Sequence, residues 1–357
     1  MSHFSLSAED LDHVLTHTRD LWEDLRGQRL FLTGGTGFFG MWLVESFLWA
    51  NERLSLDAQA VVLSRDSAAF FRKAPHLENQ SALTLHLGDV RTFVPPPGHF
   101  SHILHAATPS GTPSQNATAL SLLDTIVQGT RQVLDFAVQC GAQNLLLTSS
   151  GAIYGRQPPE LPRVSEDYPG APDPMDPKSA YGLGKRLAEH LCALYADRHG
   201  LACKIARCFA FVGPYLPLDV HFAIGNFIRD GLAGNSIQVQ GDGSAYRSYL
   251  YAADLTSWLW TILLRGRSCV PYNVGSEVAV NIGELAGIVA ANFRPHPDVC
   301  IHGRRIPGKP AERYIPLTNR GQRELGVRPW IELRKAIERT VTWHVARLRH
   351  RSDDSPV

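Results

Sequence analysis

The sequence lacks the features that mark several large classes of protein. It has no run of about 18 uninterrupted apolar residues, so it offers no candidate transmembrane helix. Its first residues show no basic start followed by an apolar stretch, so no secretory signal is visible. Lys and Arg number 35 against 34 Asp and Glu, so no excess of positive charge is available to bind a nucleic-acid backbone. We therefore expect neither a membrane nor a nucleic acid as a partner.

Cysteine is scarce as well. The chain of 357 residues has six cysteines, and none shows the CxxC spacing of a redox or zinc motif. Scattered thiols in a chain of this size are typical of a reducing compartment and not of a disulfide framework. These residues are Cys140, Cys192, Cys203, Cys208, Cys269 and Cys300. The expected location is the cytoplasm.

What the sequence does have is a repeating pattern of short apolar runs and longer helical stretches. The apolar runs predict strands at 30–33, 60–63, 83–87, 102–106, 144–149 and 203–209. Helical periodicity lies between them near 40–50, 120–140 and 179–198. Such alternation predicts an α/β fold with a doubly wound parallel sheet covered by helices on both faces.

The first of these strands runs into a glycine-rich turn and then a helix, Thr33-Gly34-Gly35-Thr36-Gly37-Phe38-Phe39-Gly40. Gly34 permits a tight turn, Gly37 lets the backbone approach a pyrophosphate, and Gly40 allows the helix to pack closely on the strand. The N-terminus of that helix offers free N–H groups and a positive dipole end to phosphates. The turn therefore predicts a dinucleotide site of the Rossmann type.

The end of the second strand bears on which dinucleotide is bound. Val61-Val62-Leu63 is followed by Ser64, Arg65 and Asp66. An acid directly after this strand binds the ribose 2′-hydroxyl of NAD, whereas an Arg accepts the 2′-phosphate of NADP. Ser64 stands where the acid would be and Arg65 follows it, which favours NADP. Asp66 is displaced by one residue and leaves NAD open.

A candidate catalytic set lies further along the chain. One strand ends in Thr148-Ser149-Ser150, and Tyr181 and Lys185 share one face of the helix that follows, because they are four residues apart. A nearby lysine cation lowers the pKa of a phenol. Such a phenol can exchange a proton with a substrate hydroxyl while a nicotinamide exchanges hydride. A serine hydroxyl from the strand end can hydrogen-bond the same oxygen.

Taken in order, these motifs resemble the extended short-chain dehydrogenases/reductases, in particular the NAD-dependent epimerase/dehydratase family that modifies nucleotide sugars. The resemblance extends from about Arg29 to His344. Further matching segments are Gly88-Asp89-Val90, His105-Ala106-Ala107, Gly129-Thr130, Ser149-Ser150-Gly151-Ala152-Ile153-Tyr154-Gly155, Gly213-Pro214, Gly241-Asp242-Gly243, Tyr246-Arg247-Ser248-Tyr249-Leu250-Tyr251 and Tyr272-Asn273-Val274-Gly275. The implied cofactor is NAD(P), with NADP slightly favoured by Arg65.

The sequence pattern and the resemblance together predict the domains. They are an N-terminal helical extension over 1–28, a Rossmann-type domain over 29–210 with a return segment at about 245–277, a smaller α/β C-terminal substrate domain over 211–244 and 278–348, and a tail over 349–357. Within the extension, Leu11, Val14 and Trp22 fall on one face of a helix predicted over 7–26. The last helix is expected at about 331–347.

Individual roles follow from the same resemblance. Ser150, with Ser149 close by, corresponds to the catalytic Ser/Thr, Tyr181 to the acid–base, and Lys185 to the residue that binds the nicotinamide ribose. Asp89 and Val90 would border the adenine. The implied cofactor-binding residues are Gly34, Gly37, Phe38, Phe39, Gly40, Ser64, Arg65, Asp89, Val90, Ala106, Ala107 and Lys185.

The implied substrate is a nucleotide-diphosphate sugar. Arg247 and Arg313 resemble the arginines that clamp the diphosphate, a task suited to a guanidinium fork. The family commonly has a substrate-contacting Asn where Ala210 stands, so Asn226 in the next segment is the candidate replacement. No metal is expected. His99, His102 and His105 are spaced like metal ligands on a helix, but 102–106 is predicted as a strand, where an odd spacing puts His102 and His105 on opposite faces.

Two departures from the family pattern separate its reactions. Dehydratases of this family carry an Asp-Glu pair after the catalytic Thr, and decarboxylases carry a Glu at the second of these places. Here the two places hold Gly151 and Ala152, which can neither donate nor accept a proton. Elimination of water therefore lacks its acid and base, and hydride transfer remains.

These observations leave an ordered set of hypotheses. The first is an NAD(P)-dependent nucleotide-sugar epimerase acting at C4, and the second is an NADPH-dependent reductase of a 4-keto sugar. A 4,6-dehydratase comes third. A catalytically silent dinucleotide sensor or scaffold is the non-enzyme alternative, against which the Tyr181–Lys185 pair argues. Family members commonly dimerise through two helices, here 120–140 and 181–198, so a homodimer is expected.

Overall fold

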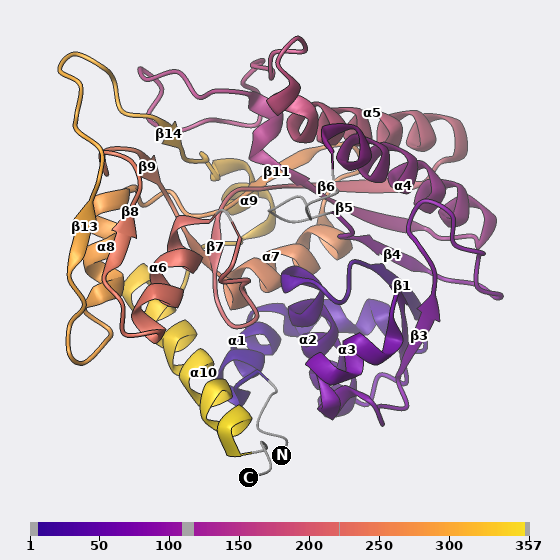
Figure 1. The fold of residues 1–357 in the computed structure, drawn as a ribbon. Helices are drawn as coiled ribbons and strands as arrows, with labels where there is room; N and C mark the ends of the chain where they lie inside the picture. The colour runs from indigo at the N-terminus through magenta and orange to yellow at the C-terminus, as the bar shows by residue number, and fades with distance from the viewer. Residues whose placement is uncertain (1–5, 109–117, 221, 354–357) are drawn as a thin grey trace.

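A computed structural model describes residues 6–108, 118–220 and 222–353, and a seven-stranded sheet lies at its centre (Figure 1). The strands are β1 (Arg29–Thr33), β2 (Gln59–Ser64), β3 (Leu83–Leu87), β4 (His102–His105), β5 (Asn144–Ser150), β6 (Ala202–Cys208) and β11 (Pro271–Val274). Their order is β11-β6-β5-β4-β1-β2-β3, and every neighbouring pair is parallel. The direction of winding reverses between β1 and β4, the point where open α/β sheets bind ligands. The predicted doubly wound sheet is confirmed.

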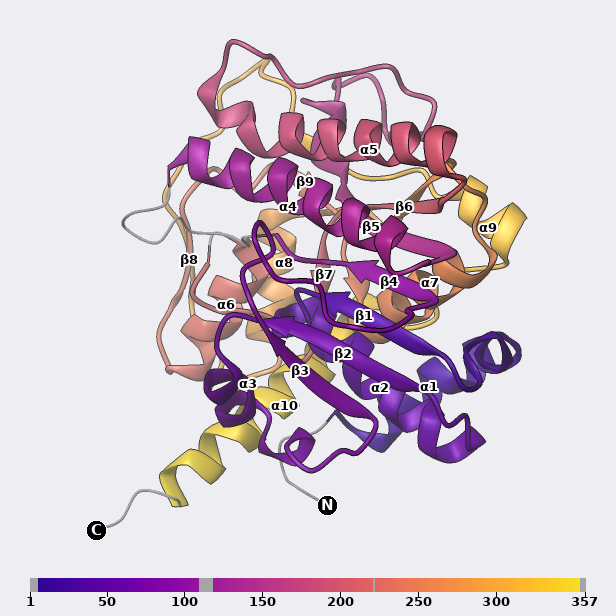
Figure 2. The same ribbon diagram turned by 90° about the vertical axis from the view of Figure 1, so that its right-hand side faces the viewer.

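Helices cover both faces of this sheet. α4 (Ala119–Gln139) and α5 (Ala180–His199) lie side by side on one face (Figure 2). α2 (Phe38–Leu54) and α7 (Ala252–Arg265) contact each other on the opposite face. Side chains of β1 alternate between the two: Phe31 packs on Phe136 of α4, while Leu30 and Leu32 join the cluster that holds α2. Two apolar cores result, one on each face.

The N-terminal extension is packed into the second of these cores. α1 (Ala8–Thr18) lies against α7 and α2, and a 3-10 helix (Arg19–Leu25) continues it. Trp22 is fully buried, with its ring 4.8 Å from that of Trp260. Ser7 is the N-cap of α1. Asp10 is buried, accepts a hydrogen bond from the Tyr251 hydroxyl and forms an ion pair with Arg339. The extension is thus an integral part of the fold.

The region after β6 forms smaller units. Its remaining strands are β7 (Phe211–Val212), β8 (Ile237–Val239), β9 (Tyr246–Arg247), β10 (Leu250–Tyr251), β12 (Val280–Asn281), β13 (Val299–Ile301) and β14 (Arg313–Tyr314). Its remaining helices are α6 (Ala223–Leu232), α8 (Ile282–Ala290), α9 (Asn319–Leu325) and α10 (Leu333–Asp353). β12-β9-β14 and β13-β8 make separate sheets, and α6, α8, β8 and β13 lie together to one side of the central sheet (Figure 1). The domain boundaries stay a prediction.

The predicted strands agree with the observed ones to within a residue or two. The helix predicted over 7–26 is only partly α-helical, because the chain tightens into the 3-10 helix after Thr18. The last helix begins at Leu333 and is described as far as Asp353, beyond the predicted end, so the predicted tail lies partly in this helix and partly outside the described residues. The six cysteines carry free thiols. Within the described ranges, no helix has the length and apolar content needed to cross a bilayer.

Replacing Trp22 with Ala is expected to lower the free energy of unfolding by about 3–5 kcal/mol, because the fully buried indole leaves a cavity that its neighbours fill only in part. Chemical denaturation followed by circular dichroism measures the change. Met175→Ala, at a side chain that is 86% exposed, is the control and should change stability by no more than about 0.5 kcal/mol. A Trp22→Ala effect as small as the control's would show that the extension is dispensable.

Candidate active site

The glycine turn packs backbone against backbone at the ends of β1 and β4. Gly34 has φ +73°, and a Cβ there would lie 2.5 Å from the carbonyl oxygen of Ala106. A Cβ at Gly40 would collide with the backbone of Gly34 and Gly35, and one at Gly35 with the Val62 side chain. These clashes explain why glycines stand at Gly34 and Gly40. Ala106 and Ala107, both expected at the cofactor, therefore lie beside the glycine turn.

The same turn suits a dinucleotide. Gly37 is the N-cap of α2, and no side chain caps this helix end, which leaves its first backbone N–H groups to a phosphate. Phe38 and Phe39, also expected at the cofactor, form the first turn of α2. The space that the glycine hydrogens leave at this helix end therefore fits a pyrophosphate, and the residues present agree with a bound NAD(P).

His105 fixes the ends of the strands that flank this turn. Its Nδ1 lies 2.7 Å from Thr33 Oγ1, and its Nε2 lies 3.1 Å from Thr130 Oγ1 of α4. Burial, with the charge of Lys185 as a smaller cause, lowers the pKa of His105 to about 3, so the ring is neutral. Its role is to join strands and helix. In the parts of the chain described, no cluster of three or more His, Cys, Asp or Glu could hold a metal.

The end of β2 has the arrangement that bears on NADP. Ser64 Oγ bonds the backbone of Asp66, and the Asp66 carboxylate caps α3 (Ser67–Lys73) by accepting from Ala69 N at 2.8 Å. Both side chains are thus engaged locally, while Arg65 is exposed. Asp66 is the residue that left NAD as an alternative cofactor, and its carboxylate is engaged as the N-cap of α3.

The two residues expected at the adenine are held by neighbours. The Asp89 carboxylate binds Arg91 at 2.8 Å, and this hydrogen bond lowers the pKa of Asp89. Val90 is buried, and a Cβ at Gly129 of α4 would lie 3.0 Å from its side chain. Their contact with adenine stays a prediction.

Lys185 of α5 is buried, and its ammonium lies beside the end of β5. Its Nζ donates to the Thr148 carbonyl oxygen at 2.7 Å and to Thr108 Oγ1 at 2.6 Å. Burial lowers the pKa of Lys185 to about 8. Both hydrogen bonds lead from α5 to the strand ends, so the ammonium lies between the β4 and β5 termini, where the dinucleotide cleft is expected.

Tyr181 and Ser150 meet at this place, but the expected electrostatics need correction. Burial raises the pKa of the Tyr181 phenol, and a hydrogen bond with Ser150 partly opposes this. The prediction that Lys185 lowers the pKa of Tyr181 is wrong for this structure, because burial dominates and the lysine bonds Thr148 and Thr108 instead. Ser150, whose Oγ also accepts from Ala152 N at 3.1 Å, is the serine that the fold brings to the phenol.

Ser149 points elsewhere. Its hydroxyl donates to Glu189 of α5 at 2.5 Å, and Glu189 forms an ion pair with Arg207 of β6 at 2.8 Å. Adjacent residues on a strand point to opposite faces, so the two serines cannot both face Tyr181. The structure brings Ser150 but not Ser149 to the catalytic pair.

Tyr314 is a residue of this site that the sequence did not reveal. A Cβ at Gly151 would lie 2.8 Å from its hydroxyl, and 2.7 Å from the Phe209 ring. The Tyr314 phenol hydrogen-bonds Ser150 and lies near Tyr181. Burial is the main cause that raises the pKa of Tyr314, and the nearby Tyr181 adds to this rise. Its position next to Arg313 in the sequence was the only signal, because its partners come from β5 and α5.

Two of the three candidate substrate residues, Arg247 and Arg313, lie on adjacent strands of a small sheet. β9 pairs with β14 so that Arg247 lies opposite Tyr314, and Arg313 lies opposite Tyr246 with its guanidinium 4.6 Å from that ring. Neighbouring residues alternate faces, so Arg247 faces the catalytic side and Arg313 the other. Neither forms an ion pair within the described residues. Asn226, on the first turn of α6, accepts from Arg229 at 3.2 Å. A shared clamp stays a prediction.

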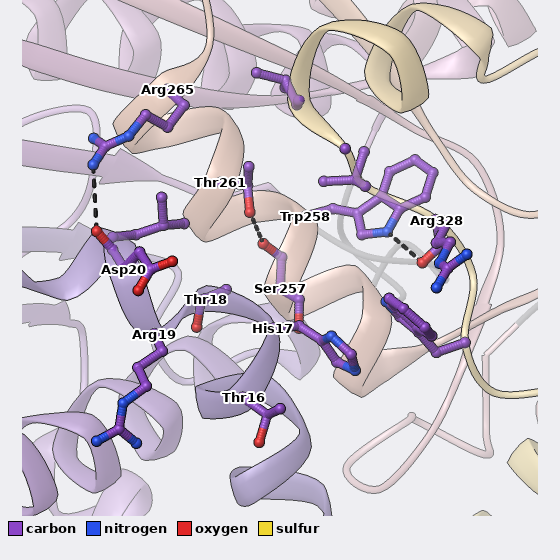
Figure 3. Close-up of a pocket in the computed structure, with 15 residues that line it drawn as sticks. Thr16, His17, Thr18, Arg19, Asp20, Ser257, Trp258, Thr261, Arg265 and Arg328 are labelled. Atoms are coloured by element: carbon purple, nitrogen blue, oxygen red, sulfur yellow. Dashed lines mark hydrogen bonds between the residues drawn. The ribbon is translucent and has the colours of Figure 1, made fainter.

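A cavity of about 330 Å³ lies elsewhere (Figure 3). Its lining comes from the N-terminal extension, from α7 and from Arg328. The residues are Thr16, His17, Arg19 and Asp20 of the extension and Ser257, Trp258, Thr261 and Arg265 of α7. None of the predicted cofactor, catalytic or substrate residues is among its lining. This cavity is therefore separate from the candidate active site.

A doubly wound sheet, a glycine turn at its switch point and a Ser–Tyr–Lys set at the ends of β5 and α5 define the class of extended short-chain dehydrogenases/reductases. Comparison with protein families agrees. A model of the NAD dependent epimerase/dehydratase family matches residues 30–275, more than half of the chain. The chain belongs to this family of NAD-dependent enzymes that modify nucleotide sugars.

The similar proteins differ in reaction. UDP-glucuronic acid decarboxylase 1 of Danio rerio is 28% identical over 92% of this chain and 75% of its own length, and UDP-glucuronic acid decarboxylase 6 of Arabidopsis thaliana is 29% identical over 87% and 86%. Among solved structures, the dTDP-glucose 4,6-dehydratase DesIV of Streptomyces venezuelae, solved with NAD, has a TM-score of 0.74 and 26% identity, covering 89% of this chain and 97% of its own. UDP-glucose 4-epimerase of Thermotoga maritima, 18% identical over 90% and 99% with the same TM-score, shares the fold.

Gly34→Ala is expected to weaken the binding of NADP(H) and NAD(H) by at least about tenfold, because the new Cβ would collide with the Ala106 backbone and the residue has positive φ. Isothermal titration calorimetry measures the affinity. Gly287→Ala is the matched control, since its Cβ would meet nothing within 4 Å. Unchanged dinucleotide affinity in a folded Gly34→Ala protein would contradict the assignment of the turn.

Proposed function

We propose that this enzyme is an NADP-dependent nucleotide-diphosphate-sugar epimerase that acts by hydride transfer at C4 of the sugar. The observation that carries the proposal is the space beside Ser150. At Gly151 a side chain would meet Phe209 and the Tyr314 hydroxyl, and Ala152 carries no proton-transferring group. The acid that family dehydratases carry at the place of Gly151 therefore has neither a residue nor room here, and the Glu that dehydratases and decarboxylases carry at the second place is replaced by Ala152.

The chain's own groups then limit what the site does. Tyr181, hydrogen-bonded through Ser150, moves a proton to or from the sugar hydroxyl. Lys185 holds the strand ends at the place where the nicotinamide ribose is expected and keeps positive charge in the cleft. NADP(H), when bound, supplies the hydride acceptor and donor. Arg247, beside Tyr314, supplies a cation for the substrate diphosphate, and the smaller sheets around β9 form the substrate domain.

A reductase of a 4-keto nucleotide sugar is the second candidate, and a specific observation favours it. The acids near the end of β2 are engaged, Asp66 with the cap of α3 and Asp89 with Arg91, whereas Arg65 is exposed. This arrangement suits NADP(H), the cofactor that reductases consume. Both candidates need the same Ser–Tyr–Lys set and differ in whether the cofactor is regenerated.

The deciding experiment offers the purified enzyme UDP-glucose, UDP-galactose, UDP-glucuronic acid and dTDP-glucose and follows products by NMR. We expect interconversion of two sugars that differ at C4, with no net change in NADPH absorbance at saturating cofactor. In a parallel assay that offers a 4-keto nucleotide sugar, stoichiometric consumption of NADPH would favour the reductase instead. Release of CO₂ from UDP-glucuronic acid, or formation of a 4-keto-6-deoxy sugar, would refute the proposal.

Tyr181→Phe is expected to lower kcat by at least about a thousandfold while NADPH affinity changes less than about threefold, because the hydroxyl transfers a proton and leaves the glycine turn intact. Steady-state kinetics and calorimetry measure the two quantities. Tyr168→Phe, in the proline-rich segment between β5 and α5, is the control and should turn over as wild type does. Undiminished turnover in Tyr181→Phe would instead show that a different group donates the proton.

We also propose a homodimer formed through α4 and α5. Leu187 and Leu194 of α5 are 42% and 51% exposed, and Leu120 of α4 is exposed as well. Leu194→Asp is expected to shift the protein from dimer to monomer at micromolar concentration, measured by light scattering. Val278→Asp, at an exposed valine outside both helices, should leave the dimer intact. A monomeric wild-type protein would remove this proposal.

A further inference from the structure

Lys73, the last residue of α3, reaches the phosphate-binding turn. Its Nζ donates to the carbonyl oxygen of Thr36 at 2.7 Å. Thr36 lies between Gly35, which packs on Val62 of β2, and Gly37, the N-cap of α2. The ammonium is therefore held on the side of the turn that adjoins β2.

The charge of Lys73 has no compensating acid. Within the described residues, no carboxylate oxygen lies within 4.0 Å of its Nζ, and the nearest aromatic ring, that of Tyr215, is 5.6 Å away. The neighbouring charge is another cation, because Arg347 of α10 donates to the Lys73 carbonyl oxygen. Burial and Arg347 lower the pKa of Lys73 to about 8. A half-buried cation without an acid is costly, and a bound anion would offset that cost.

Two phosphate-containing parts of NADP lie near a Rossmann turn, the pyrophosphate and the 2′-phosphate. The pyrophosphate lies at the helix N-terminus, where the α2 N–H groups meet it. The adenosine ribose lies at the end of β2, so a phosphate on its 2′-oxygen lies beside the residues that follow that strand. Lys73 is attached to the β2 side of the turn, and Arg65 follows β2 directly. Asp66 and Asp89, the acids that follow the ends of β2 and β3, are already engaged.

We propose that Lys73 binds the 2′-phosphate of NADP(H) together with Arg65 and so determines the cofactor specificity of this enzyme. The inference rests on the proposed preference for NADP. The 2′-phosphate is a dianion, and two basic side chains from different elements, the end of β2 and the end of α3, hold it from two sides. The bond from Lys73 to Thr36 positions the ammonium before the ligand arrives.

The test measures binding of NADPH, NADH, 2′,5′-ADP and ADP to wild type, Lys73→Met and Lys73→Arg by isothermal titration calorimetry. Lys73→Met keeps the aliphatic stem and removes the charge. We expect the dissociation constants of NADPH and 2′,5′-ADP to rise about ten- to a hundredfold, the range for loss of a charge-assisted hydrogen bond, while those of NADH and ADP change less than about twofold. Lys73→Arg, which keeps the charge, should restore most of the NADPH affinity.

Lys335→Met is the matched control, because Lys335 is an exposed lysine of α10 that pairs with Glu338. It should leave all four affinities unchanged. Equal weakening of NADPH and NADH by Lys73→Met would overturn the inference, since it would place Lys73 at the pyrophosphate or give it only the task of holding the turn. An unchanged NADPH affinity in Lys73→Met would overturn it as well.

The outcomes separate this inference from the proposed cofactor preference. If wild type binds NADH more tightly than NADPH, the proposed NADP dependence fails and the inference fails with it. If wild type prefers NADPH and Lys73→Met keeps that preference, only the role of Lys73 fails, and Arg65 carries the specificity. Arg65→Ala, measured in parallel, should reduce the preference for NADPH whichever way Lys73 behaves.

Discussion

The candidate site depends on the common register of three parallel strands. Thr33 of β1 lies opposite His105 of β4, and His105 lies opposite Leu147 of β5. The strands therefore deliver the glycine turn, Ala106 and Ser150 to one edge of the sheet, and the neutral His105 ring ties β1 to α4. A shift of one residue in this register would turn every side chain to the other face, so the turn and the serine would no longer share a cleft.

A buried polar network supports this edge from below. Arg207 of β6 pairs with Glu189, which holds Ser149, and it also donates to the Tyr154 hydroxyl. Tyr154 donates to Asn273 of β11, whose backbone N–H is accepted by Glu166 in the proline-rich segment. Because each charged side chain of this network has an ion-pair or hydrogen-bond partner, the cost of burying the network is offset. The network connects β5, β6, β11, α5 and the proline-rich segment, and so orders the wall next to Tyr181.

Members of this family differ in reaction, and the surroundings of Ser150 are where we expect this chain to differ from its relatives. Two relatives similar in sequence are decarboxylases, and a structural relative is a dehydratase. In this chain Phe209 and Tyr314, from β6's end and β14, fill the space in front of Gly151, with their ring centroids 4.7 Å apart. Two aromatic rings therefore occupy the volume that a carboxylate would need, and a third hydroxyl joins those of Ser150 and Tyr181. Fold similarity alone says nothing of this difference.

The sequence alone determined where the main strands lie, where the glycine turn lies and that Tyr181 and Lys185 share a helix face. Periodicity, glycine sterics and helix geometry act over a few neighbouring residues, so a local pattern is enough to predict these features. Only the tertiary structure decided which of two adjacent serines faces the phenol, that Lys185 bonds Thr148 instead of acidifying Tyr181, and that Arg247 and Arg313 lie on opposite faces. It also brought Lys73 to Thr36 and Tyr314 to Ser150, across 37 residues in the first case. Contacts of this kind depend on how elements distant in the chain pack, and no local pattern encodes them.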